Sequence, residues 1–196
     1  MNSDGLVLRD ADIRPALRSS LLGKHADDPG TVIIEELGVC RGQVRVDLAV
    51  VNGAIHGYEI KSDRDSLRRL ATQIAFYGKV VDRATLVVGE RHLPTAVEML
   101  PPWWGVVRVH ETRRKQVFKK VRRGRKNPGR DARALVELLW LDDALALLEE
   151  REAARGVRGR PRRFVWDRVC EHFSLEEIAS AVRARLKART ARPDHP

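Results

Sequence analysis

The stretch RVDLAVVNGAIHGYEIK (residues 45–61) contains two apolar segments separated by Asn52-Gly53, and it decides the fold of this chain. β-Branched residues are frequent in both segments, as is typical of strands. Asn and Gly tolerate the positive φ angles of a tight primed hairpin turn. The sequence therefore predicts two strands joined by a hairpin turn at Asn52-Gly53.

Three charged side chains interrupt this apolar hairpin. Side chains alternate along a strand, so Glu59 and Lys61 project to one side while Ile60 points to the other. Asp47 lies in the preceding strand between two apolar residues. Charges in such a setting are costly unless another charge, water or a metal ion compensates them. We therefore expect Asp47, Glu59 and Lys61 to converge on a site.

Two carboxylates and a lysine suit the hydrolysis of a phosphodiester. Paired carboxylates are hard oxygen ligands for Mg²⁺ or Mn²⁺. A lysine beside them can activate the attacking water or stabilise charge on a phosphate. On spacing alone, a cross-strand salt bridge between Lys61 and Asp47 on a solvated sheet face is the simpler interpretation.

The order of these residues carries a resemblance to a known superfamily. Asp47, followed after eleven residues by Glu59-Ile60-Lys61, resembles the core signature of the PD-(D/E)XK nucleases. A helical pattern follows, with Gln73 and Tyr77 one turn apart, and it resembles the Gln-bearing helix of many members. Val46 stands where the name-giving motif has proline, a position that varies widely in the superfamily.

Most of the chain resembles one bacterial family within that superfamily, which carries a locus-style name. Its recurring stretches are matched by GYEIKSD (57–63), LVVG (86–89) and WWGV (103–106). The resemblance implies an α/β fold with a restriction-endonuclease-like core, ordered α-β-β-β-α-β, whose central mixed sheet is flanked by helices. It also implies an α-helical C-terminal appendage.

The resemblance further implies roles for individual residues. Asp47 and Glu59 would bind Mg²⁺ or Mn²⁺, the carbonyl of Ile60 could also reach the metal, and Lys61 would activate the attacking water or stabilise the transition state. Gln73 would position the metal-bound water or the DNA backbone. An upstream acid is implied as an additional metal ligand, and we choose Glu36 over Glu35 because it directly precedes Leu-Gly in the sequence. A solvent-facing strand carboxylate is the competing interpretation of Glu36.

Charge is unevenly distributed along the chain. Residues 1–110 contain fourteen basic and fourteen acidic side chains, whereas residues 111–196 contain twenty-three and thirteen. A basic surplus confined to one region is the electrostatic footprint of a polyanion, most simply nucleic acid and here DNA. We expect residues 111–130 to form a linker or phosphate-contacting loop, with a merely solubilising linker as the alternative. The expected phosphate contacts are Arg113, Arg114, Lys115, Lys119, Lys120, Arg122, Arg123, Arg125 and Lys126.

Residues 1–110 are expected to form the nuclease-like core, and residues 131–190 a helical subdomain. Apolar spacing predicts one helix from Asp131 through Glu150 and two further helices, the last opened by a capping box at Ser174. These helices could grip DNA in the manner of a helix-turn-helix unit. An equally simple interpretation is a helical packing subdomain.

Several classes of protein are disfavoured by the sequence. No run of eighteen apolar residues and no signal-peptide pattern is present, so we expect a cytoplasmic protein without a membrane partner. Cys40 and Cys170 have no close-spaced partners, which argues against a disulfide framework or a zinc finger.

The leading hypothesis is a metal-dependent deoxyribonuclease in repair, defence or mobile-element processing. A catalytically silent nuclease-fold module for DNA binding or assembly is the alternative. A third hypothesis is a transcription regulator that acts through the C-terminal helices. A homodimer is compatible with the first hypothesis, because many nucleases of this kind cut two strands as dimers.

Overall fold

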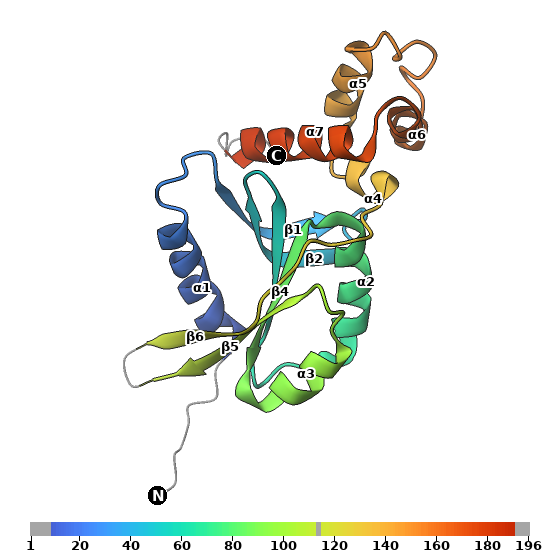
Figure 1. Cartoon of the computed structure of the whole chain (residues 1–196). Helices are drawn as coiled ribbons and strands as arrows, with labels where there is room; N and C mark the ends of the chain where they lie inside the picture. Colours follow the sequence, from blue (N-terminus) through green and yellow to red (C-terminus); the bar gives the residue numbers. More distant parts are fainter. Residues whose placement is uncertain (1–8, 113–114, 191–196) are drawn as a thin grey trace, which may run out of the picture.

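A mixed sheet lies at the centre of the protein (Figure 1). A computed structural model describes residues 9–112 and 115–190. Among these residues, six strands lie side by side in chain order, with β3–β4 and β4–β5 parallel and the other pairs antiparallel. The strands are β1 (Val32–Val39), β2 (Val44–Val51), β3 (Ile55–Lys61), β4 (Arg83–Gly89), β5 (Gly105–Glu111) and β6 (Gln116–Arg122).

Helices cover both faces of this sheet (Figure 1). Helix α1 packs on one face, α2 and α3 cover the other, and four helices follow at the C-terminal end of the described chain. The predicted α/β class and the order α-β-β-β-α-β are therefore confirmed. The helices are α1 (Asp10–Lys24), α2 (Leu70–Val80), α3 (Leu93–Met99), α4 (Ala132–Val136), α5 (Leu141–Glu149), α6 (Arg162–His172) and α7 (Leu175–Thr190), and short 3₁₀ turns η1 (Leu67–Arg69) and η2 (Glu90–His92) precede α2 and α3.

Strand β3 alternates as its sequence predicts. Tyr58 and Ile60 belong to the apolar cluster beneath α1. Glu59 and Lys61 alternate with them in sequence and face α2 on the opposite side of the sheet. The period of two in a strand thus places both charged residues on one face.

The hairpin between β2 and β3 is confirmed, but the primed turn is wrong. Val51 pairs with Ile55, so the loop holds three residues rather than two. The N–H of Ala54 donates to the side-chain oxygen of Asn52 at 3.2 Å, and neither Asn52 nor Gly53 has a positive φ. The Asn52 side chain closes the turn, so the strained conformation that favours Asn-Gly is not needed.

Three other boundaries differ from the sequence analysis. Residues 111–130 contribute the unpredicted strand β6, whose Phe118 packs into the α1-side cluster although basic residues surround it. The helix expected over residues 131–150 divides into α4 and α5, because the N–H groups of Leu138 and Leu139 donate three residues back, to Leu135 and Val136, and this tighter turn ends α4. Ser62 binds Asp65 through its N–H and hydroxyl, yet α2 begins only at Leu70, after the turn η1.

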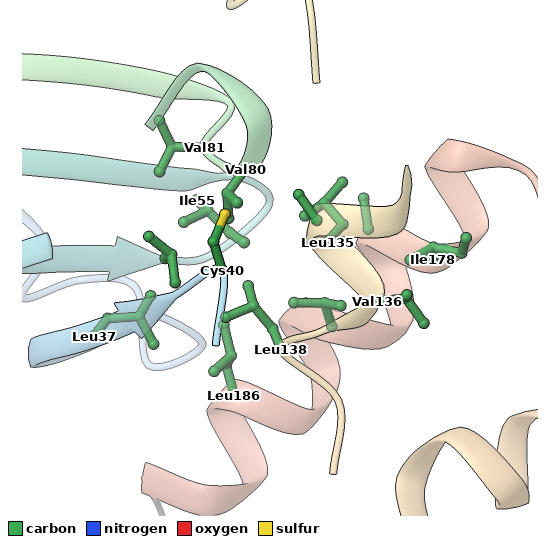
Figure 2. Close-up of a cluster of buried hydrophobic side chains, with 14 of the residues drawn as sticks. Leu37, Cys40, Ile55, Val80, Val81, Leu135, Val136, Leu138, Ile178 and Leu186 are labelled. Carbon is green, nitrogen blue, oxygen red and sulfur yellow. The ribbon is translucent and has the colours of Figure 1, made fainter. Parts of the chain in front are cut away.

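One hydrophobic core continues from the sheet into the C-terminal helices (Figure 2). Cys40 from the end of β1 and Val80 from the end of α2 meet Leu135 and Leu138 from α4 and its following turn. Leu186 of α7 closes the same cluster. The free thiol of Cys40 is buried here, and burial raises its pKa above the ordinary value. Apolar burial therefore holds the C-terminal helices against the sheet.

Gly89 ends β4 where the chain passes close to the loop after β3. A Cβ atom added at Gly89 would lie 2.2 Å from Oδ1 of Asp63, which accepts the N–H of Arg91 at 3.0 Å. Gly89→Ala is therefore expected to lower the free energy of unfolding by about 1–3 kcal/mol, the usual cost of overpacking. Urea denaturation measures this loss. Gly53→Ala is the matched control, because nothing lies within 4 Å of its added Cβ, and an equal loss in both would contradict the steric explanation.

Candidate active site

The candidate site lies where β2 and β3 separate. Their paired residues end at Leu48 and Tyr58, and beyond that point the strands no longer form a ladder. The N–H of Ile60 instead donates to Oδ2 of Asp47 at 2.7 Å. A side-chain carboxylate thus satisfies a backbone donor that a neighbouring strand would otherwise satisfy, and this fixes Asp47 at the fork.

A cleft of about 460 Å³ opens at this fork. One wall is formed by residues 42–45 at the start of β2, and the other by residues from Asp65 through Gln73 around the start of α2. Helix α1 contributes Asp10 and Arg14. The cleft therefore brings together residues from α1, β1, β2, β3 and α2, and its lining includes Asp47, Glu59, Ile60, Lys61, Gln73 and Glu36.

Glu59 and Lys61 form a buried ion pair in the cleft. Lys61 Nζ lies 2.6 Å from Glu59 Oε1, and the two residues are 5% and 1% exposed. Gln73 Nε2 donates to the same carboxylate oxygen, while the hydroxyl of Tyr77 donates to Oε2 at 2.5 Å. Burial and the Glu59 charge raise the pKa of Tyr77 well above its usual value, so the phenol remains a donor. Three donors thus hold Glu59 in one orientation.

Arg14 of α1 forms ion pairs with a second set of carboxylates. Its Nη2 lies 3.0 Å from Asp10 Oδ2 and 3.1 Å from Asp47 Oδ1, and its Nη1 contacts Glu36. Burial would lower the pKa of this guanidinium, but Asp47, Glu36 and Asp10 raise it, so Arg14 remains charged. Glu35 pairs with Arg18 at 2.9 Å and does not line the cleft, so of these two neighbouring acids Glu36 is the one that lies at the site.

The carboxyl group of Asp47 holds a proton more tightly than an ordinary aspartate. Burial and the nearby Glu59 raise its pKa from 3.8 to about 7, against the opposing effects of the Ile60 N–H and Arg14. The folded state therefore binds a proton that the unfolded chain loses between about pH 4 and pH 7. Stability should accordingly fall as pH rises through that window, once the contributions of other groups are subtracted.

Chemical denaturation in the presence of a chelator, repeated from pH 4.5 to pH 7.5, measures this dependence. Asp47→Asn is expected to flatten the curve, because asparagine carries no titrating proton. The steepest contribution of a single group is about 1.4 kcal/mol for each pH unit. A variant whose stability falls with pH as steeply as that of the wild type would contradict the assignment.

The cleft offers acceptors that lack donors. Among residues 9–112 and 115–190, Oε1 of Gln73 and Oδ1 of Asp10 are buried without a hydrogen-bond partner. Buried acceptors of this kind suit a cation or a bound water. The oxygen-rich donor set therefore fits Mg²⁺ or Mn²⁺, although Arg14 and Lys61 already neutralise much of the acidic charge. The described residues contain no group of three His, Cys, Asp or Glu side chains placed to hold a metal by themselves.

The basic segment lies outside the residues that line the cleft. Arg113 and Arg114 lie outside the described residues. Arg122 is committed to the fold, because it donates to the carbonyls of Trp104 and Pro101 at 2.8 and 3.2 Å. The remaining expected phosphate contacts are exposed, either just before β6, along it or in the segment after it: Lys115, Lys119, Lys120, Arg123, Arg125 and Lys126. Together with Arg83, the last three help to line a separate depression of about 830 Å³.

Sequence reasoning assigned no role to two residues that organise the site. Tyr77 lies four residues after Gln73 on α2, so helical spacing could have placed both near Glu59. Arg14 precedes Asp47 by thirty-three residues, and no pattern in the sequence connects them.

Comparison with known proteins places the chain in a family. A family model described as "Bacteriophage P4 protein cII" matches residues 6–194. This chain belongs to the bacteriophage P4 protein cII family. The matched family is described by the name of a phage protein and not by that of a PD-(D/E)XK nuclease, so the resemblance to that superfamily remains a prediction.

One relative and one solved structure extend the comparison. Protein cII of Enterobacteria phage P4 is 31% identical over 119 residues, which cover 61% of this chain and 45% of that protein. The matched part thus spans less than half the length of the phage protein. Pyrococcus furiosus SfsA, solved in complex with Ca²⁺, aligns with a TM-score of 0.37 and 12% identity over 66% of this chain and 69% of that one. This likeness is too low to support an argument. In the described part of the chain, no helix is long and apolar enough to cross a membrane.

Proposed function

We propose that this protein is a metal-dependent nuclease that hydrolyses phosphodiester bonds, most simply in DNA. The observation that carries the proposal is the convergence of Asp47, Glu59 and Lys61 at the fork between β2 and β3. These residues line one cleft, and burial and hydrogen bonds hold each in place. Such preorganised charge is what catalysis of phosphodiester hydrolysis requires.

Each side chain has a role in this proposal. Asp47 and Glu59 would hold Mg²⁺ or Mn²⁺, with the unpartnered Oε1 of Gln73 as a further oxygen at the site. The bound ion would supply Lewis-acid stabilisation of the phosphoryl group. Lys61, fixed by Glu59 at 2.6 Å, would orient the attacking water or stabilise charge on the phosphate.

The exposed basic side chains of β6 and the following segment support nucleic acid as the substrate. They include Lys119, Lys120 and Arg123, and no acid occurs from Thr112 through Arg130. Phosphate contacts of this kind give affinity without sequence preference. The net charge of the chain, +10, is also positive and favours binding to a polyanion.

A cleavage assay tests the proposal. Circular, linear, single-stranded and branched DNA are each incubated with the protein and Mg²⁺ or Mn²⁺, with a chelator in the control reactions. We expect cleavage of at least one substrate that stops when the chelator is added. The preferred substrate would then indicate the pathway.

One observation favours the silent module as the second candidate. Arg14 and Lys61 already pair with the carboxylates that a metal would need. A protein whose metal position is taken by its own cations could bind nucleic acid without cutting it. Tight binding without metal-dependent cleavage of any of the four substrates would overturn the nuclease and establish this alternative.

A further inference from the structure

The cationic side chains that line the cleft fall into two kinds. Arg14 and Lys61 lie against carboxylates inside it. Arg45 and Arg69 also line the cleft, but both are exposed, and neither guanidinium makes a hydrogen bond or ion pair with any other residue of the described chain. Two free arginines therefore remain at the opening of a cleft whose inner charges are already paired.

These two arginines come from opposite walls. Arg45 lies at the start of β2, directly after the turn from β1, and the carbonyl of the same residue lies 3.5 Å from the hydroxyl of Tyr77. Arg69 ends the turn η1 and leads into α2, four residues before Gln73. Both residues are thus adjacent to the segments that hold Glu59, yet neither takes part in holding it.

Charge in the cleft is consequently arranged in two layers. Glu59 is buried, and Asp47 lies at the fork with 16% of its side chain exposed, so these two acids form the inner layer. Asp10 and Glu36 lie nearer the opening, with 39% and 43% of their side chains exposed, and their charges are paired with Arg14. The exposed guanidiniums of Arg45 and Arg69 form the outer layer. Guanidinium groups bind phosphate oxygens through paired donors, whereas acids repel them. A phosphate would therefore be held by the exposed guanidiniums, and the group covalently attached to that phosphate would face the inner layer.

We propose that Arg45 and Arg69 form a phosphate-binding rim that holds a nucleic-acid strand across the cleft. Each arginine would take a backbone phosphate on its own wall, so that the phosphodiester between them faces Asp47 and Lys61. This inference rests on the proposed function for the nature of the ligand. It adds a binding site separate from the basic residues of β6, which the structure keeps outside the cleft.

The rim has a measurable signature in the salt dependence of binding. Each neutralised phosphate contributes about 0.7–0.9 to the slope of log affinity against log salt concentration. Removing two such contacts should lower that slope by about 1.4–1.8. Affinities measured between 50 and 200 mM salt are sufficient to detect this change in slope.

Fluorescence anisotropy with a labelled oligonucleotide, in a chelator so that nothing is cut, tests the rim. We compare the wild type, the double variant Arg45→Gln/Arg69→Gln, and a control that removes the same charge from the loop before α6, Arg155→Gln/Arg160→Gln. Arg155 and Arg160 are exposed and lie outside the cleft and β6. We expect the rim variant to bind at least about tenfold more weakly than the wild type at low salt. Its slope of log affinity against log salt concentration should be lower by the amount given above, whereas the slope of the control should equal that of the wild type.

Three results would overturn the rim: an unchanged slope in Arg45→Gln/Arg69→Gln, an equal loss in the control, or no binding by the wild type. Thermal denaturation of both variants guards against misfolding, which is not expected because both rim side chains are exposed and unpartnered within the described chain. Failure of the nuclease proposal is separate. A wild type that binds through the rim but never cuts refutes the nuclease alone, whereas one that cuts with an unaltered slope in the rim variant refutes the rim alone.

Discussion

Lys61→Ala is expected to reduce metal-dependent cleavage by about a thousandfold while nucleic-acid binding stays close to that of the wild type. Positioned groups that act only in the transition state contribute on the order of 10²–10⁴ to rate. Lys61 is suited to such a role because Glu59 fixes its ammonium group 2.6 Å away, in a setting from which water is largely excluded. Its charge is compensated by that of Glu59, so it contributes little to long-range attraction of a polyanion.

Asp47→Asn provides the companion variant for this prediction. Asparagine keeps an oxygen that can accept the Ile60 N–H, so the fork should survive while the charge is lost. We expect a similar loss of cleavage and no loss of binding. Initial rates with Mg²⁺ and with Mn²⁺, together with anisotropy in a chelator, measure the two effects separately.

Arg18→Ala is the matched control for these two variants. Its guanidinium pairs with Glu35, is 45% exposed and does not line the cleft, so cleavage should stay within about twofold of the wild type, as expected for an exposed ion pair. An equal loss of binding and cleavage in Asp47→Asn and Lys61→Ala would contradict their assignment to the chemical step.

The sequence predicts the centre of the site because its rules are local. Alternation along residues 55–61 is enough to place Glu59 and Lys61 on one face, and the apolar hairpin is enough to bring Asp47 alongside them. The fork between β2 and β3 is a different matter. It depends on Asp47 replacing a ladder partner for Ile60, which no periodicity encodes.

Contacts between segments that are distant in sequence could not be predicted for a similar reason. Arg14 reaches the cleft because α1 packs across the sheet, and that packing follows from tertiary structure rather than from any spacing. The strand β6 was hidden because its apolar Phe118 is surrounded by basic residues that suggest a solvated loop. In both cases tertiary contacts decide the outcome: α1 packs across the sheet, and β6 pairs with β5.

The basic segment shows that composition cannot separate a phosphate contact from a structural arginine. Arg130 belongs to the basic stretch that we expected to be a linker or phosphate-contacting loop, yet its side chain is only 3% exposed. Its Nη1 lies 2.7 Å from Asp82 Oδ1, and its Nη2 contacts Glu176 of α7. Arg130 therefore links the start of β4 to the C-terminal helices instead of facing solvent.

Asp82→Ala is accordingly expected to lower the free energy of unfolding by about 3–5 kcal/mol, the usual cost of leaving one partner of a buried pair without the other. The carboxylate of Asp82 makes two interactions: Oδ1 pairs with Arg130, and Oδ2 accepts the N–H of Ile55 at 2.7 Å. Its removal would leave a buried guanidinium and a buried backbone donor unsatisfied. Urea denaturation measures the total loss, and hydrogen exchange should show faster opening of α4 and α7 than of β3 and β4.

Two variants separate the charge from the hydrogen bond. Asp82→Asn keeps an acceptor for Ile55 but loses the charge opposite Arg130, so its loss of stability should be intermediate. Glu149→Ala breaks the exposed pair with Arg158, whose side chains are 51% and 68% exposed, and should change stability by less than about 1 kcal/mol. A loss in Asp82→Ala no larger than that of Glu149→Ala would mean that the C-terminal helices are held by apolar burial alone, with the Arg130 link contributing nothing measurable.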